Sequence, residues 1–165
     1  MKSPLHSDRK SVAAALGAMR EAAGIAAREA RRTLSRLGEE TEAYARDRSA
    51  EDSWVDRTGN LRSSVGYGVY DGRERVAGSG FPQVKDGTDG PAEGRKCLED
   101  VAAGLAAGAR QSLVVVAGMD YASEVEALDN KDVLAGPELL ARRKLPGYME
   151  RTRRRVEGLV NRLLK

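Results

Sequence analysis

Apolar residues in the first 48 positions recur with the period of an α-helix. They fall at steps of four and three, with Thr33 in the one missing place, and so form a heptad-like stripe. The members of the stripe are Val12, Leu16, Met19, Ala23, Ala26, Ala30 and Leu37. This spacing predicts one long amphipathic helix. Because much of the stripe is alanine, which buries little area, we expect the helix to lie against something larger.

Local signals mark the expected ends of this helix. Ser7, followed by Asp8, predicts the N-cap, because a serine oxygen can accept a hydrogen bond from the first turn and an acid suits the positive end of the helix. Gly38 predicts either the end of the helix or a kink. Residues 39–48 are then expected to continue as a second helical piece.

The following segment changes to the period of a strand. Val65, Tyr67 and Val69 alternate with other residues, which predicts a strand near 64–70. Asp71-Gly72 predicts a two-residue type I′ turn, because that turn needs positive φ at both positions, and a return strand over 73–78. The β-branched run 113–117 predicts a buried strand in the centre of the same sheet.

Helical periods return in the second half of the chain. They predict a helix over 95–110, a short helix that begins near Tyr121, and a helix start at Pro137, since proline suits the first turn. Residues 145–147, Leu-Pro-Gly, interrupt the pattern, and a final helix is expected after them. Its apolar stripe is Met149, Thr152, Val156, Leu159, Val160 and Leu163.

Together these elements predict a single α+β domain over residues 1–165. It has a long N-terminal helix, a small antiparallel sheet with a β-hairpin and helices on one side, a central helix and a basic C-terminal helical segment over 136–165. Trp54 and Leu61 are expected to be buried against the first helix. Residues 79–94 are rich in glycine and proline and hold almost nothing apolar, so they predict a long mobile loop.

Charge is spread unevenly along the chain. Of 165 residues, 28 are Lys or Arg and 25 are Asp or Glu, a net charge of +3. Residues 142–165 hold nine basic and two acidic side chains, whereas 49–141 holds nine basic and 16 acidic ones. The basic patch at the C-terminal end consists of Arg142, Arg143, Lys144, Arg151, Arg154 and Arg155. It can meet nucleic-acid phosphates, the acidic middle of a neighbouring copy, or solvent alone.

The composition excludes several kinds of chemistry. One cysteine, Cys97, and one histidine, His6, exclude an intrachain disulfide, a cysteine-rich zinc site and a histidine-based triad. No wholly apolar run exceeds the five residues of 113–117, which are too few to span a membrane. The sequence has no phosphate-loop or dinucleotide glycine motif. We therefore expect no metal, no cofactor and no membrane contact, in a protein made in the cytoplasm.

A run of acids over 120–132 is the strongest candidate for catalysis. Paired carboxylates can perform acid–base or two-metal chemistry, but Glu124 and Glu126 are two residues apart and point to different faces of a helix. The full set is Asp120, Glu124, Glu126, Asp129 and Asp132. A small hydrolase and a solvated acidic face are both open, and we expect the acidic face, with no catalytic residue.

Two blocks of the sequence carry a resemblance to a known family. Residues 58–64, Thr-Gly-Asn-Leu-Arg-Ser-Ser, follow the long helix, and residues 114–126 place a β-branched run before a glycine, Tyr-Ala and Val-Glu. The chain thus resembles the head–tail joining, or tail-completion, neck proteins of long-tailed bacteriophages and prophages, in which Thr-Gly-x-Leu-Arg-x-Ser is followed by the same series. The matching residues are Thr58, Gly59, Leu61, Arg62, Ser63, Gly118, Tyr121, Ala122, Val125 and Glu126.

The resemblance implies a non-enzymatic virion protein at the junction of head and tail. It implies a ring of copies that forms on assembly, with connector and tail-tube proteins as partners. DNA contact of the basic end is possible but not favoured, because no aromatic residues interleave with the basic ones. The family continues after Val-Glu with a Phe-Gly-Thr stretch, which residues 127–134 replace here. An acidic middle and a basic end suit head-to-tail contacts that close into rings, and we expect mainly monomer in dilute solution. The alternative is a nucleic-acid-binding module that uses the basic C-terminal helix.

Overall fold

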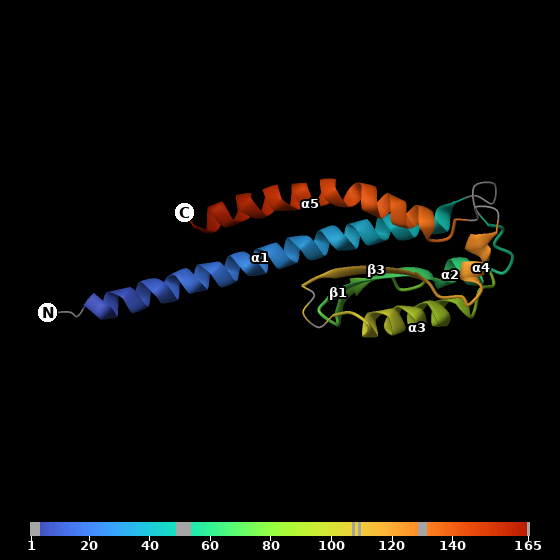
Figure 1. Cartoon of the computed structure of the whole chain (residues 1–165), viewed down its shortest axis with the longest axis horizontal. Helices are drawn as coiled ribbons and strands as arrows, with labels where there is room; N and C mark the ends of the chain where they lie inside the picture. Colours follow the sequence, from blue (N-terminus) through green and yellow to red (C-terminus); the bar gives the residue numbers. More distant parts are fainter. Residues whose placement is uncertain (1–3, 49–53, 107, 109, 129–131, 165) are drawn as a thin grey trace.

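The fold combines long helices with one small sheet, as the computed structural model of the chain shows (Figure 1). The structure describes residues 4–48, 54–106, 108, 110–128 and 132–164. The predicted α+β class is confirmed. The elements in chain order are α1 (Pro4–Asp47), α2 (Asn60–Ser64), β1 (Val65–Asp71), β2 (Glu74–Gly78), α3 (Gly90–Ala103), β3 (Ser112–Ala117), α4 (Ala122–Ala127) and α5 (Ala135–Leu163).

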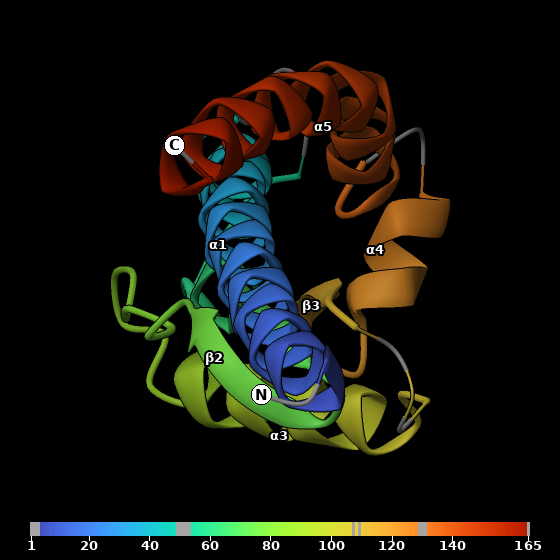
Figure 2. The same ribbon diagram turned by 90° about the vertical axis from the view of Figure 1, so that its left-hand side faces the viewer.

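The helices cover both faces of the sheet. Figures 1 and 2 show α1 on one face and α3 on the other, while α5 runs back along α1 on the side away from the sheet. The expectation of helices on one side is therefore wrong. The burial of β1 reflects this two-sided cover. Its residues 65–70 are all buried, because a strand covered on both faces has no solvated side.

The antiparallel sheet has the strand order β2-β1-β3. Val65 lies opposite Ala117 and Tyr70 opposite Ser112, so β1 is central and β3 stands at an edge. The predicted central position of 113–117 is wrong. A β-branched run indicates that the faces of a strand are covered, and β3 does pack against both α1 and α3, but it does not indicate the strand's place in the sheet.

The β1–β2 hairpin is confirmed with its turn shifted by one residue. Asp71 pairs with Glu74, so Gly72 and Arg73 form the loop. Among these two residues only Gly72 has positive φ, at 61°, which is the pattern of a type II′ turn rather than the predicted type I′ turn.

Two predicted breaks fall inside continuous helices. α1 begins before Ser7, which is therefore not its N-cap, and it runs through Gly38 without interruption. A Cβ added at Gly38 would lie 2.2 Å from Tyr67 Cδ2, so this glycine permits a close approach of helix and sheet. α5 likewise continues through Pro146, which removes one hydrogen bond of the helix, and the helix curves over α1 in Figure 1.

The segment before α3 differs from the predicted loop. α3 begins at Gly90 and ends at Ala103, so the loop stops at Asp89 and the helix predicted over 95–110 is displaced. Phe81 is buried at 2% exposure, and Arg46 donates a hydrogen bond of 2.8 Å to the carbonyl of Pro82. The mobility of the loop stays a prediction, but the reason for it, the lack of anything to bury, is wrong.

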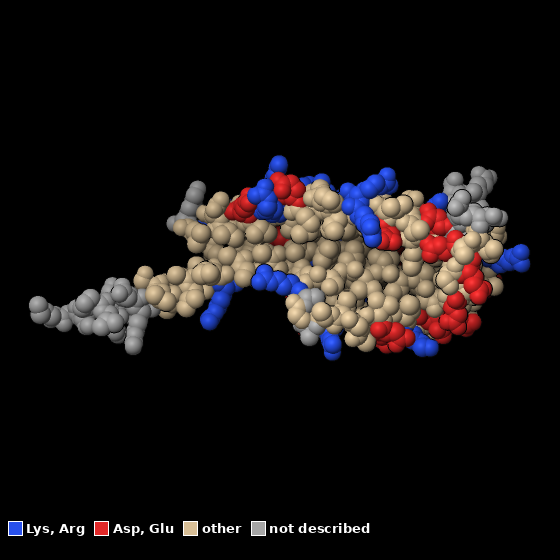
Figure 3. All heavy atoms as spheres, viewed as in Figure 1, with Lys and Arg blue, Asp and Glu red and all other residues tan. Residues whose placement is uncertain are grey.

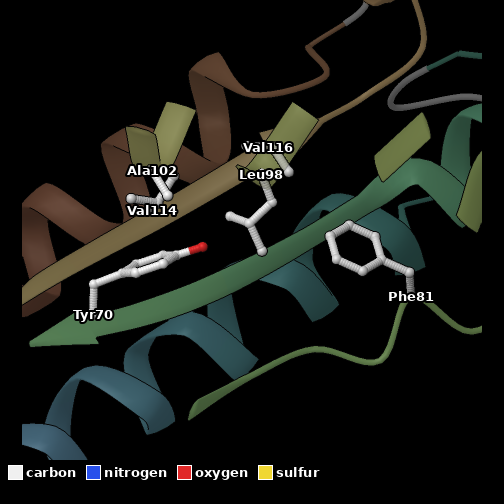
Figure 4. Packing of buried hydrophobic residues seen from close by; sticks show 6 residues of the cluster. All are labelled: Tyr70, Phe81, Leu98, Ala102, Val114 and Val116. Carbon is white, nitrogen blue, oxygen red and sulfur yellow. The ribbon is translucent and has the colours of Figure 1, made fainter. Parts of the chain in front are cut away.

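Two apolar clusters hold the domain together. The first fills the space between the sheet and α3, where Figure 4 shows Leu98 between Tyr70 and Phe81. The second joins Trp54 and Leu61, at 3% and 2% exposure, to Ala122 and Val133. The predicted burial of Trp54 and Leu61 is thus confirmed, but their partners come from α4 and the chain before α5 rather than from the first helix.

Candidate assembly surfaces

The Thr58–Ser64 block forms a turn that satisfies its own polar groups. Gly59 has a φ of 89° and donates its N–H to Asp56 Oδ1 at 3.0 Å. Ser63 Oγ donates to the Gly59 carbonyl at 2.7 Å and accepts from the Val84 N–H at 2.8 Å. Thr58 Oγ1 accepts from the Asn60 N–H at 3.3 Å, although Gly59 and not Thr58 is the N-cap residue of α2. These groups position the turn and the loop beside it.

Arg62 connects this turn to the end of α1. Its guanidinium donates to the carbonyl of Arg48 at 2.7 Å and to that of Arg46, and it lies 3.4 Å from Asp56 Oδ2. The same group stacks over the Trp54 ring at 5.3 Å from its centroid. Because these contacts face inward and the side chain is 15% exposed, Arg62 stabilises the domain and offers little to a partner.

The second block also fixes local structure. The Gly118 N–H donates to the Ser64 carbonyl at 3.2 Å, which joins the two blocks. Glu126 Oε1 accepts hydrogen bonds from the N–H groups of Leu134 and Ala135 at 2.9 and 2.6 Å, at the start of α5. This carboxylate therefore caps the positive end of α5. Sequence reasoning missed that role, because Glu126 lies eight positions before the group it caps.

Two of the acids over 120–132 have structural partners in the described part of the chain. Glu126 is the cap described above, and Asp132 makes a 2.5 Å ion pair with Arg48 at the end of α1. Asp120 and Glu124 are exposed, and Asp129 lies outside the described residues. Within the described ranges no group of three or more His, Cys, Asp or Glu is placed to hold a metal ion.

The two family-like blocks meet at a surface pocket. The pocket has a volume of about 460 Å³, and Trp54, Thr58 and Leu61 line it opposite Tyr121 and Val125. Two apolar side chains of its lining, Leu128 and Val55, are each 63% exposed. Of the ten residues that carry the resemblance, Thr58, Leu61, Tyr121 and Val125 share this pocket, and Ala122 is buried directly behind it.

The basic residues of α5 are largely paired within the chain. Arg142 pairs with Glu138 at 2.6 Å, Arg154 with Glu150 at 2.9 Å and Lys144 with Glu40 at 2.7 Å. Arg155 reaches Glu29 of α1 at 2.9 Å, and Arg151 stacks over the Tyr148 ring at 4.6 Å. Arg143 lies beside them in the groove between α1 and α5. Figure 3 shows the resulting mixture of basic and acidic side chains along α5.

A polar seam joins α5 to α1. Thr33 and Thr152 share a hydrogen bond of 2.5 Å between their hydroxyls, and Tyr148 donates to Glu40. The hydrogen bonds from Lys144 and Tyr148 lower the pKa of Glu40 to about 2. The predicted apolar stripe of the C-terminal helix is wrong at its first member. Met149 is 44% exposed, and its neighbour Tyr148 is the buried residue.

The N-terminal half of α1 carries an uncovered apolar face. Val12, Leu16 and Met19 are 57%, 48% and 68% exposed, and α1 projects past the sheet and α3 in Figures 1 and 3. Where this face enters the body it forms the floor of a groove of about 640 Å³. The lining residues are Ala23, Ala26, Ala27, Ala30 and Leu34 of α1, Leu145 and Met149 of α5, and Asp71, Arg110 and Gln111.

Comparison of the chain with protein-family models, with curated proteins and with solved structures found no match. In the part of the chain that the structure describes, none of the helices has the length and apolar character needed to cross a membrane. The features of the molecule that bear on its function are the two family-like blocks, the basic surface of α5 and the uncovered face of α1.

Proposed function

We propose that this protein is a structural subunit of the head–tail junction of a long-tailed bacteriophage or prophage. It acts by oligomeric assembly during tail completion and not by catalytic turnover, with itself, a connector protein and a tail-tube protein as partners. The observation that carries the proposal is the projecting half of α1, whose three large apolar side chains are exposed in a single chain. Such a face is typical of a surface that another protein covers.

The resemblance in two blocks supports the choice of this family. The residues that carry it are brought together in the fold, since Thr58 and Leu61 share a pocket with Tyr121 and Val125. The two exposed apolar side chains in the lining of this pocket offer a second surface for a neighbouring virion protein. The inward contacts of Arg62, Ser63 and Glu126 then keep the pocket in shape.

Charge has a smaller part in this proposal than the sequence suggested. From the sequence, the acidic residues of a neighbouring copy were one of the partners open to Arg142, Arg143, Lys144, Arg151, Arg154 and Arg155. Four of them already have a carboxylate partner in their own chain. Since exposed ion pairs contribute about 1 kcal/mol or less each, exchange of partners between copies adds specificity and salt sensitivity rather than affinity.

Genetic complementation tests the proposal. In the phage or prophage that encodes this chain, deletion of its coding sequence should leave filled heads and separate tails. The wild-type chain supplied in trans should restore joined, infectious particles. Joined particles in the complete absence of the chain would contradict the proposal, and so would separation of heads and tails that the wild-type chain fails to repair.

Nucleic-acid binding is the second candidate, and one observation favours it. Arg32, Arg36, Arg151 and Arg155 line a groove of about 240 Å³ between α1 and α5, beside a single carboxylate, Glu29. Phosphates bound there would release counterions, so the affinity for duplex DNA would fall steeply as salt rises. Tight binding of duplex DNA whose affinity falls steeply with salt, and which Arg36→Gln weakens, would favour this candidate. Weak binding that does not depend on salt would favour assembly.

A further inference from the structure

Six members of the apolar stripe of α1 are spaced symmetrically along the helix. From Val12 to Ala30 the steps are four, three, four, three and four, so the series reads the same from either end and has its centre at residue 21. The two ends differ in size, because the first three members are large and the last three are alanines. The members are Val12, Leu16, Met19, Ala23, Ala26 and Ala30.

These six residues lie on one continuous face of α1. Val12 and Ala30 are 18 residues apart, or about five helical turns, so their side chains leave the helix in the same direction. Leu37, one heptad further along, is 1% exposed in the body. The uncovered face is therefore the continuation, beyond the end of the sheet, of the face of α1 that is buried in the body.

We propose that this face binds the same face of a second copy, with the two α1 helices antiparallel and a twofold axis near residue 21. In this register Val12 lies opposite Ala30 of the second copy, Leu16 opposite Ala26, and Met19 opposite Ala23. Each large side chain meets a small one, which lets the helices approach closely and interdigitate. The inference deepens the proposed function, on which it rests, by naming the partner of the α1 face.

Steric arguments favour the antiparallel direction over a parallel one. Along α1 the sheet, α3 and the start of α5 all lie toward the C-terminal end (Figure 1). Parallel helices would bring the two bodies to the same end, where they compete for space. Antiparallel helices place the bodies at opposite ends and overlap over residues 12–30, about 27 Å of helix. The Val12 end of each copy then reaches the groove of the other, beside Leu145 and Met149.

The arrangement closes on itself and leaves other surfaces available. A twofold contact uses the same patch on both copies, so it forms a dimer and not a chain of subunits. The outer side of α5 and the pocket at Trp54 lie outside the overlap. Because the overlap involves one helix from each copy and many alanines, it lies at the small end of stable interfaces, and the dimer should dissociate on dilution.

Disulfide trapping tests the direction and the register. In a Cys97→Ala background, the double variant L16C/A26C should form a covalent dimer under mild oxidation, because position 16 of one copy faces position 26 of the other. The matched control is L16C alone, since two copies of position 16 would be about 15 Å apart along the helices, beyond the reach of a disulfide. Efficient dimer formation by L16C alone, or none by the double variant, would overturn the arrangement.

Solution mass as a function of concentration tests the same face without cysteines. The wild-type chain should pass from monomer to dimer as concentration rises. Leu16→Glu should weaken this association by about tenfold or more, because each copy would bury an unpaired charge. Ala14→Glu is the control, because position 14 is exposed on the opposite side of the helix, and it should leave the association unchanged. Equal circular dichroism of all three chains would show that the fold is intact.

The outcomes separate this inference from the proposed function. A chain that stays monomeric at all concentrations, or that dimerises equally with Leu16→Glu, overturns the antiparallel dimer even if deletion of the chain still leaves heads and tails separate. Conversely, a dimer with the predicted disulfide pattern supports the inference even in a phage whose particles join without the chain.

Discussion

The two halves of α1 share one hydrophobic period and have opposite environments. In the C-terminal half Leu37, Thr41 and Ala45 are exposed by 1% or less, under the cover of the sheet, α5 and the segment before it. In the N-terminal half the large members of the stripe are about half exposed or more. A period of four and three residues thus defines an apolar face of the helix. How much of that face is buried depends on which other segments of the chain pack against it.

The covered half of α1 therefore contributes to the stability of one chain, and the uncovered half contributes to association between chains. Residues in the covered half add to the free energy of unfolding of one chain, since their apolar area leaves water when that chain folds. Residues in the uncovered half gain the same benefit only when another copy covers them. Substitutions at equivalent stripe positions should therefore have large effects on unfolding in one half and small effects in the other.

The largest contrast is expected between two leucines of the stripe. Leu37→Ala should lower the free energy of unfolding by about 2–5 kcal/mol, because it leaves a cavity in a fully buried site. Leu16→Ala should change it by about 0.5 kcal/mol or less in the monomer, because the side chain is already in water. Urea unfolding at low protein concentration measures both. Similar losses for the two variants would mean that the N-terminal half is covered within a single chain.

Two glycines of the same helix give a second contrast of opposite sign. Gly38→Ala should destabilise by about 1–3 kcal/mol, because the new Cβ collides with the Tyr67 ring against which α1 packs. Gly17→Ala should stabilise by about 0.5–1 kcal/mol, since nothing lies within 4 Å of the new Cβ and alanine favours a helix. Thermal unfolding of the two variants gives the sign directly, and destabilisation by Gly17→Ala would contradict the account.

A smaller effect is expected at the polar seam between α1 and α5. The pKa of Glu40 is lowered from 4.5 to about 2 by hydrogen bonds from Lys144 and Tyr148. Its contribution is therefore fully present above pH 4.5 and is lost as pH falls from 4.5 toward 2. Because the carboxylate is 28% exposed, Glu40→Gln should cost about 1 kcal/mol at neutral pH.

The pH dependence supplies the control for this prediction. The difference in free energy of unfolding between wild type and Glu40→Gln should shrink between pH 4.5 and pH 3, while other carboxylates titrate equally in both chains. A difference that stays constant, or that grows as the pH falls, would show that the Glu40 carboxylate does not hold α5 on α1.

The sequence predicted most helices and strands, but not how these elements pack against one another. The alternation from Val65 to Val69 predicted β1, and the β-branched run predicted β3, because these patterns depend on the period of one strand. The edge position of β3, the two-sided cover of the sheet and the uninterrupted path through Gly38 and Pro146 were not predicted. Each depends on contacts between segments far apart in the chain, which override local helix-breaking signals.

For the candidate sites, too, the sequence did not show which residues contact one another in the fold. The two family-like blocks were recognised as patterns, and the structure brings them together at the pocket beside Trp54. Their polar members serve as internal contacts, which no spacing in the sequence indicates. The partners of Lys144 and Arg155, Glu40 and Glu29, lie more than a hundred residues earlier in the chain, so the sequence does not indicate these two ion pairs. The pairs of Arg142 with Glu138 and of Arg154 with Glu150 have the i, i+4 spacing of a helix and could have been predicted.

Amide hydrogen exchange at two protein concentrations tests most directly the claim that the uncovered face of α1 is an assembly surface. We predict that the amides of residues 12–20, in the projecting part of α1, exchange quickly in dilute solution and become protected in concentrated solution, while those of residues 37–47 are protected equally in both. Unchanged exchange over residues 12–20, or new protection along the outer side of α5 instead, would contradict the claim.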